Sequence, residues 1–305
     1  MTEAICSITL FSATPVDSTP GIPFNFKHIY GTNRVDEGPL CHRRVWRVFT
    51  LAAPSLLATF SPYTDNTASF GFGPDGKDPY PFSVKPDRKL TLEDIMKMNR
   101  DYYEGTDFDQ SSGTDAGPFG DVMRYMPTPL WQDPINGVEW DAYKKGLGYQ
   151  RVISLWRTAY STVTQSRGFL PDEIGGVSWI AQYAPHQSVF VPVYAAVPTV
   201  PSSQRIGTQY RVERLSNYWA HSVTANYLSR WYKYTIGDVR EMQAKLENAL
   251  FTKQPVVEAH ALELLQTNAD REGAIKYLEE YQENAAVGVR DAWWEFFWAM
   301  TSKYR

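Results

Sequence analysis

The spacing of apolar residues along the chain changes near residue 217. Before that point, several short segments are rich in β-branched and aromatic residues, namely residues 152–156, 160–163, 176–181 and 188–194. Such runs are typical of strands, turn signals at Pro171 and Pro185 separate them, and their close succession predicts an antiparallel sheet. Because Pro192 has no backbone N–H, we expect the last strand at an edge of the sheet or at a bulge.

Beyond residue 217 the apolar residues recur every three or four positions, which is the helical period. This spacing predicts helices over residues 236–251, 257–265 and 274–281. The last segment, residues 291–300, is crowded with aromatic side chains: Trp293, Trp294, Phe296, Phe297 and Trp298. We interpret it as a helix that docks on a core, because large exposed apolar patches are rare.

A short helix with a narrow apolar face is predicted to start at Thr91. Thr91 and Asp94 have the spacing of a capping box, and Gly105 is a natural stop. The loop that follows combines glycines with carboxylates, either as a solvated surface loop or as part of a site. Its acidic residues are Asp107, Asp109, Asp115 and Asp121.

Two further strands are predicted near the start of the chain. Residues 5–11 have the pattern of a weak strand, and residues 24–31 alternate as a strand does, with a proline-containing loop between the two. Residues 64–77 are predicted to form a loop, and residues 125–150 an irregular region, because Gly and Pro recur in both.

Composition narrows the class of protein. The chain has 305 residues, of which 43% are hydrophobic and 21% are charged, and both fractions are ordinary for a soluble globular protein. With a net charge of -4 and no basic patch, we expect no nucleic-acid partner. No apolar run reaches the length of a membrane span, Glu3 is unlike a signal peptide, and only two cysteines are present. We therefore expect a cytoplasmic protein with no membrane partner.

Three arginines are the first candidates for a binding role. Arg43, Arg44 and Arg47 are interleaved with apolar residues. They either form a solvated face, as charge runs often do, or direct a guanidinium into a pocket that binds a carboxylate. The five histidines show no zinc-ligand spacing, and the acidic loop lacks the ligand spacing of an EF-hand. We expect neither a metal nor a cofactor.

Several distinctive short segments are spread along the chain. They are HRRVWRVF at 42–49, LAAPS at 51–55, YPFSVKP at 80–86, RDYYEGT at 100–106, FD at 108–109, AGPFG at 116–120 with Arg124 after it, LPD at 170–172, GGV at 175–177 and VPVY at 191–194. Together they resemble the motifs of the dipeptidase A family. That family is a cysteine branch of the N-terminal-nucleophile hydrolases and is related to the secernins. Tyr102 stands where the family pattern has His.

The resemblance implies an α+β fold with α-β-β-α layers, here incomplete and followed by a helical C-terminal region. It also implies hydrolysis of short peptides by a cysteine at the mature N-terminus, whose free α-amino group serves as the base. In the family this cysteine lies well upstream of the first segment matched here. We therefore expect the chain to be a C-terminal portion, folded as a single domain over residues 1–305. Within it, residues 1–21 are a divergent start, 22–210 are mainly sheet and loops, and 211–305 are helical.

Three hypotheses follow for the function. In the first, the chain supplies part of the fold and of the pocket of a dipeptidase-type hydrolase and needs a separate N-terminal chain or self-association. In the second, it is a nonenzymatic binding or scaffold module that retains the fold. In the third, removal of residues 1–5 exposes Cys6 as the nucleophile. Cys41 lies in the interior of the chain and cannot become N-terminal, so we expect a structural role for it. The candidate residues for binding a dipeptide substrate are Arg43, Arg44, Arg47, Asp115 and Arg167.

Overall fold

The computed structural model describes residues 4–5, 38–60, 62, 80–81, 83–112, 116–120, 122, 151–267 and 269–305. The chain divides into two compact units. The first unit comprises Met1–Asp94, Gly105–Phe108 and Tyr125–Ile153, and the second comprises Ile95–Glu104, Asp109–Arg124 and Ser154–Arg305. The single-domain organisation expected from the sequence stays a prediction.

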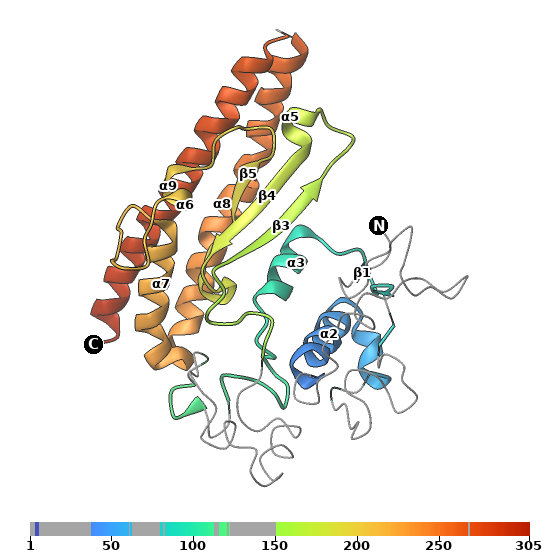
Figure 1. Ribbon diagram of the computed structural model, residues 1–305, viewed down its shortest axis with the longest axis vertical. Helices are drawn as coiled ribbons and strands as arrows, with labels where there is room; N and C mark the ends of the chain where they lie inside the picture. Colours follow the sequence, from blue (N-terminus) through green and yellow to red (C-terminus); the bar gives the residue numbers. More distant parts are fainter. Residues whose placement is uncertain are drawn as a thin grey trace, which may run out of the picture. The chain divides into compact units, whose positions relative to one another are not determined.

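The second unit contains a three-stranded antiparallel sheet, as the sequence predicts (Figure 1). Its order is β3 (Tyr160–Ser166), β4 (Gly176–Gln182) and β5 (Val191–Tyr194), with Val163 opposite Trp179 and Trp179 opposite Pro192. The expectation for Pro192 is confirmed, because β5 is an edge strand. A strand over residues 152–156 was wrong: this stretch is irregular, with the backbone N–H of Ser154 donating to the carbonyl of Asp101 at 2.9 Å.

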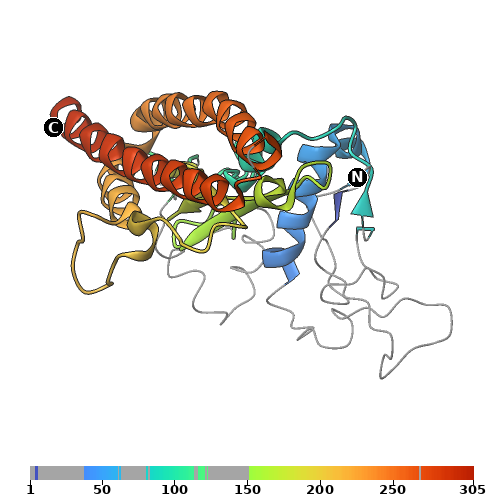
Figure 2. The same cartoon turned by 90° about the horizontal axis from the view of Figure 1, so that it is seen from above.

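Long helices cover one face of this sheet (Figure 2). They are α7 (Asn217–Leu228), α8 (Tyr232–Thr267) and α9 (Arg271–Lys303), and α8 lies alongside α9 (Figure 1). Shorter helical segments are α5 (Asp172–Gly175), η5 (Pro185–Gln187), α6 (Ser202–Arg205) and η6 (Ser229–Trp231). The aromatic segment near the C-terminus docks as expected, since Trp293 is fully buried.

The separate helices expected on either side of Pro255 are instead one helix, α8. A proline removes one helical hydrogen bond, so the sequence pattern favours a break there. The buried stripe of α8 nevertheless continues through this point, from Val239 to Ala261. We infer that packing along this continuous face outweighs the lost bond, as tertiary contacts commonly do.

The first unit is described mainly by α2 (Gly38–Ala52), η1 (Pro54–Ala58) and a short ribbon of β1 (Ala4–Ile5) with β2 (Ser83–Val84). Phe49 is fully buried and lies edge-on to Tyr80 at 6.5 Å between ring centroids. Of the strand predicted over residues 5–11, only Ile5 is described, and the strand predicted over 24–31 and the irregular stretches 64–77 and 125–150 lie outside the described residues.

Helix α3 (Leu92–Asn99) begins with the predicted capping box. The backbone N–H of Thr91 donates to the Asp94 carboxylate at 2.8 Å, and the N–H of Asp94 donates to Thr91 Oγ1 at 3.2 Å. The predicted stop at Gly105 was wrong, because the helix ends at Asn99. At its end the hydrogen bonds change to the tighter three-residue spacing, since the N–H of Arg100 donates to the carbonyl of Lys97 at 3.1 Å and the N–H of Asp101 to that of Met98 at 3.2 Å. Tyr103, whose φ of 67° is in the left-handed region, then keeps the helix from resuming before Gly105.

The residues after α3 are held by a buried ion pair within the second unit. The Arg100 guanidinium binds both carboxylate oxygens of Glu247 on α8, and it also donates to the carbonyls of Pro185 at 3.0 Å and Ser188 at 3.2 Å. Oε1 of Glu247, one of the two oxygens bound by Arg100, also accepts the backbone N–H of Phe190 at 2.8 Å. One arginine thereby ties the RDYYEGT segment to α8 and to the chain that leads into β5.

The last glycine of the AGPFG segment, Gly120, is required by the local structure. Gly120 has a φ of 68°, which disfavours a side chain, and a Cβ there would lie 2.5 Å from the Lys233 side chain and 2.8 Å from the Ser111 carbonyl oxygen. The N–H of Lys233 donates to the carbonyl of Phe119 at 3.0 Å. Close approach of this loop to the start of α8 therefore requires glycine at position 120.

We predict that removing one member of the buried pair destabilises the second unit strongly. In Arg100→Met the Glu247 carboxylate, whose side chain is 7% exposed, loses its charged partner, so the free energy of unfolding should fall by about 3 kcal/mol or more. Urea unfolding measures the loss. The control is Arg88→Met, which removes an ion pair to Asp94 from an arginine that is 64% exposed and should cost much less, because solvent screens an exposed pair. Equal losses in the two variants would contradict the assigned role of Arg100.

Candidate functional site

The three candidate arginines of the first unit lie on α2 in different environments. Arg43 is 2% exposed, and its guanidinium carbon lies 3.7 Å from the centroid of the Phe108 ring. Arg44 and Arg47 are partly buried. Burial raises the pKa of the neighbouring Tyr80, and the positive charge of Arg43 opposes that shift. The arginines therefore do not form a uniformly solvated face, and Arg43 is a cation stacked on an aromatic ring.

Arg167, the candidate in the second unit, follows strand β3 and makes several contacts. Its guanidinium forms a two-pronged ion pair with Glu258 on α8, with both N–O distances 2.8 Å. It also donates to the carbonyls of Ile174 at 2.5 Å and Gly175 at 3.4 Å. These bonds tie the β3–β4 turn to α8, and a role for Arg167 in substrate binding stays a prediction.

Two other candidates lie outside the described residues, namely Cys6 and Asp115. Cys41 lies within α2, which agrees with its internal position in the sequence. In the described residues of the acidic loop, Asp109 is used locally: its carboxylate accepts the backbone N–H of Ser111 at 2.8 Å and the Ser111 hydroxyl at 2.7 Å. That arrangement is an ordinary turn contact.

A serine and a histidine meet inside the second unit at the separation of a nucleophile and its base. Ser154 Oγ lies 2.7 Å from His186 Nδ1, and it accepts the backbone N–H of His186 at 3.1 Å. Because Ser154 is 1% and His186 3% exposed, a substrate cannot reach either. The pair is a buried structural contact and not a catalytic dyad, even though its separation fits one.

The His186 ring also packs edge-on against two tyrosines. Its centroid lies 5.7 Å from that of Tyr102 and 6.0 Å from that of Tyr232, and the two tyrosine rings are 5.7 Å apart. Burial raises the pKa of Tyr102 to about 12, although Arg240, which donates to its hydroxyl at 2.9 Å, works against the shift. Tyr102, at the position where the family pattern has His, is therefore a buried neutral phenol.

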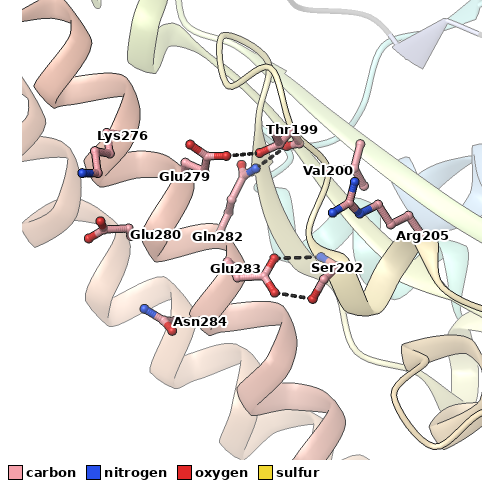
Figure 3. A pocket seen from close by; sticks show the side chains of 10 residues that line it. All are labelled: Thr199, Val200, Ser202, Arg205, Lys276, Glu279, Glu280, Gln282, Glu283 and Asn284. Carbon is pink, nitrogen blue, oxygen red and sulfur yellow. Dashed lines mark hydrogen bonds between the residues drawn. The ribbon is translucent and has the colours of Figure 1, made fainter.

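An open pocket of about 550 Å³ lies between α9 and the loop that leads into α6 (Figure 3). Its lining includes three carboxylates, two of which bind the loop. The Glu283 carboxylate accepts from the backbone N–H of Ser202 at 2.7 Å and from the Ser202 hydroxyl, and Glu279 accepts from the Thr199 hydroxyl at 2.5 Å. Glu279 and Glu283 thus hold the loop on α9, and no ligand is needed to explain why these two carboxylates are there.

Within the part of the chain that the structure describes, no group of His, Cys, Asp and Glu side chains could hold a metal ion. Over the same residues, every helix is too short or too polar to span a bilayer.

Reasoning from the sequence missed the buried polar residues of the helices. Glu247 is 5% and Gln282 1% exposed, and both bind backbone groups next to or within β5. Their signal was present in part: Gln243, Glu247 and Gln254 repeat at helical spacing along the buried face of α8. From sequence alone, a polar residue in a helix is expected to face solvent, because the backbone group that it binds is not known.

We predict a loss of stability in mild acid that arises from buried histidines. Burial lowers the pKa of His186 to about 3 and of His221 to about 4, from 6.5. Below pH 6.5 the unfolded chain binds protons that the folded chain does not, so the stabilisation is present above pH 6.5 and is lost toward pH 4. The slope reaches about 1.4 kcal/mol per pH unit for each histidine.

Urea unfolding between pH 7.5 and pH 5 measures this slope, with pH values chosen to bracket the ordinary histidine range. The variant His186→Gln should show a shallower dependence on pH, because a titrating group is removed. His221→Gln should likewise make the dependence shallower, because burial lowers the pKa of His221 as well. An unchanged slope in His186→Gln would contradict the assignment.

Comparison with known proteins places these features in a family. Residues 3–245 match the model of peptidase family C69. The chain is 22% identical to a dipeptidase of Bifidobacterium longum over 223 residues, 22% identical to dipeptidase A of Lactobacillus helveticus over 242 residues, and 24% identical to a probable dipeptidase B of Lactococcus lactis over 206 residues. These alignments cover 73%, 79% and 66% of this chain, respectively.

The same alignments cover 35%, 40% and 33% of the three relatives, so the chain spans well under half of their length. The matched residues include α2, α3, the three-stranded sheet and the first part of α8, whereas α9 lies beyond them. The resemblance noted in separated sequence motifs is confirmed by a match over most of the chain. The protein belongs to peptidase family C69.

Proposed function

We propose that this chain is part of a dipeptidase-type cysteine hydrolase of short peptides, and that its nucleophile comes from sequence outside these 305 residues. The observation that carries the proposal is the family match over residues 3–245. The names of the relatives, all dipeptidases or probable dipeptidases, support dipeptides as the substrate class. The short span of each relative that the chain covers supports a contribution from further sequence.

The proposal includes the layered fold of N-terminal-nucleophile hydrolases. Supporting it, the second unit has an antiparallel sheet with long helices on one face, which corresponds to one β layer and one α layer. We also propose a cytoplasmic location, which is supported by the low cysteine content, since proteins of reducing compartments seldom depend on disulfides.

Within the proposed pocket, Arg44 and Arg47 are the preferred binding residues. Both lie on α2 and keep part of their side chains accessible, whereas Arg43 is buried against an aromatic ring. A guanidinium binds a carboxylate through two parallel hydrogen bonds, and a dipeptide always presents a terminal carboxylate. Arg167 and Asp115, which belong to the second unit, stay predicted substrate-binding residues.

The test is a dipeptide hydrolysis assay on this chain alone and mixed with the polypeptide encoded immediately upstream of it. Release of free amino acids only in the mixture is the expected result. Activity of this chain alone that disappears in Cys6→Ser would replace the proposal with the hypothesis that Cys6 is the nucleophile. Dipeptide binding by calorimetry, without hydrolysis in either sample, would favour the nonenzymatic binding module.

We predict that Arg44→Ala and Arg47→Ala lower kcat/KM of the active mixture by about tenfold or more, mainly through KM, because a charged contact to the substrate is lost. Arg205→Ala, which removes an exposed arginine of the second unit, serves as the control and should leave both constants unchanged. Unchanged constants in both α2 variants would exclude these arginines from substrate binding.

A further inference from the structure

Helix α8 carries two largely buried glutamates on one side. Glu247 and Glu258 are 11 residues apart, which is close to three helical turns, so both project from the same side of the helix. The helix is continuous between them, through Pro255. Their side chains are 7% and 14% exposed, respectively, so neither is an ordinary solvated surface charge.

Each glutamate binds an arginine from another part of the second unit. The Arg100 guanidinium binds both oxygens of Glu247, and the Arg167 guanidinium binds both oxygens of Glu258. Arg100 lies in the RDYYEGT segment after α3, and Arg167 lies between β3 and β4. Each arginine also donates to two backbone carbonyls of neighbouring chain. The two ion pairs therefore have the same construction.

Strand β5 connects the two ion pairs. The N–H of Phe190, just before β5, donates to Oε1 of Glu247 at 2.8 Å. The hydroxyl of Tyr194, the last residue of β5, donates to Oε1 of Glu258 at 3.0 Å. Burial raises the pKa of the Tyr194 hydroxyl, so it stays protonated and remains a donor. The two ends of this short strand are thus attached to two glutamates of one helix.

The spacing of the glutamates suits the length of the strand. The 11 residues of helix between them rise about 16 Å. The chain from Phe190 to Tyr194 extends about 13 Å, and the Tyr194 side chain adds reach at its end. Strand β5 can therefore lie along α8 with each end on its own glutamate, in agreement with the packing of β5 against α8.

Further side chains of α8 share the same partners. Gln254 donates to Oε1 of Glu258 at 2.8 Å, and Gln243 donates at 2.8 Å to the carbonyl of Ser188, which Arg100 also binds. A buried polar network is stabilising only while its members keep their partners. The loss of one arginine therefore disturbs the bonds that hold the chain of β5.

We propose that the two ion pairs act as one clamp that docks β5 on α8, so that the RDYYEGT segment and the turn between β3 and β4 open and close together. When one pair breaks, its glutamate is left buried without a charged partner, which is costly. The end of β5 that this glutamate holds is then released, and the strand transmits the release to the other pair.

The clamp couples segments that both carry motifs, RDYYEGT at one end and LPD with GGV at the other. All of its members belong to the second unit. The inference therefore concerns the motion of this unit and does not depend on peptide hydrolysis.

The first test is a double-mutant cycle of Arg100→Met and Arg167→Met, measured by urea unfolding. Substitutions more than about 10 Å apart usually have additive effects on stability. We expect the double variant to lose clearly less than the sum of the single losses, because either substitution alone already weakens the other pair. An additive loss would contradict the proposal.

The matched control combines Arg100→Met with Arg271→Met. Arg271 is 71% exposed and pairs with Glu173 of α5, which follows the same turn, but it does not bind α8. These two substitutions should be additive. Equal departure from additivity in the control and in the cycle would show that the coupling is not specific to the clamp and would overturn the proposal.

Amide hydrogen exchange provides the second test, with the milder variant Arg167→Lys, which covers the case in which Arg167→Met does not fold. Lysine keeps the charge but cannot form the two-pronged pair. The N–H of Phe190, at the opposite end of β5, should exchange about tenfold faster or more. The N–H of Ala286, which is buried on α9, is the control and should change less. Unchanged exchange at Phe190, or equal acceleration of both amides, would overturn the proposal.

Discussion

The interaction on which the second unit depends is the buried ion pair between Arg100 and Glu247. Its members come from a loop and from α8, and both also bind backbone groups around residues 185–190. A charge that leaves water is costly unless a partner and hydrogen bonds replace its hydration, and this pair provides both. The RDYYEGT segment, which the sequence marks as a family motif, thus helps to hold the chain that leads into β5.

The same principle accounts for the way in which α8 and α9 hold β5. Polar side chains buried on α8 and α9 bind the N–H groups of Phe190, just before β5, and of Tyr194 within it. A buried Gln or Glu is stabilising only when its partner is satisfied as well, so these residues fix where the helices meet the sheet.

The sequence predicted the local features of the fold well. The strands predicted over residues 160–163 and 176–181 from their β-branched and aromatic residues, the edge position of Pro192, and the capping box of Thr91 with Asp94 each depend on neighbours in the chain, and each was confirmed. The end of α3 and the continuity of α8 through Pro255 depend on long-range packing, which periodicity cannot reveal. Likewise, the candidate arginines were visible as residue types, but the burial of Arg43 and the ion pair of Arg167 were not.

The account assigns a supporting role to the described parts of the chain and places the reactive thiol in sequence outside it. The most direct test is alkylation of the active mixture with iodoacetamide, followed by mapping of the modified cysteine by mass spectrometry. The account predicts that inactivation accompanies modification of one cysteine at the N-terminus of the upstream polypeptide. Inactivation that instead accompanies modification of Cys6 or Cys41 would contradict it.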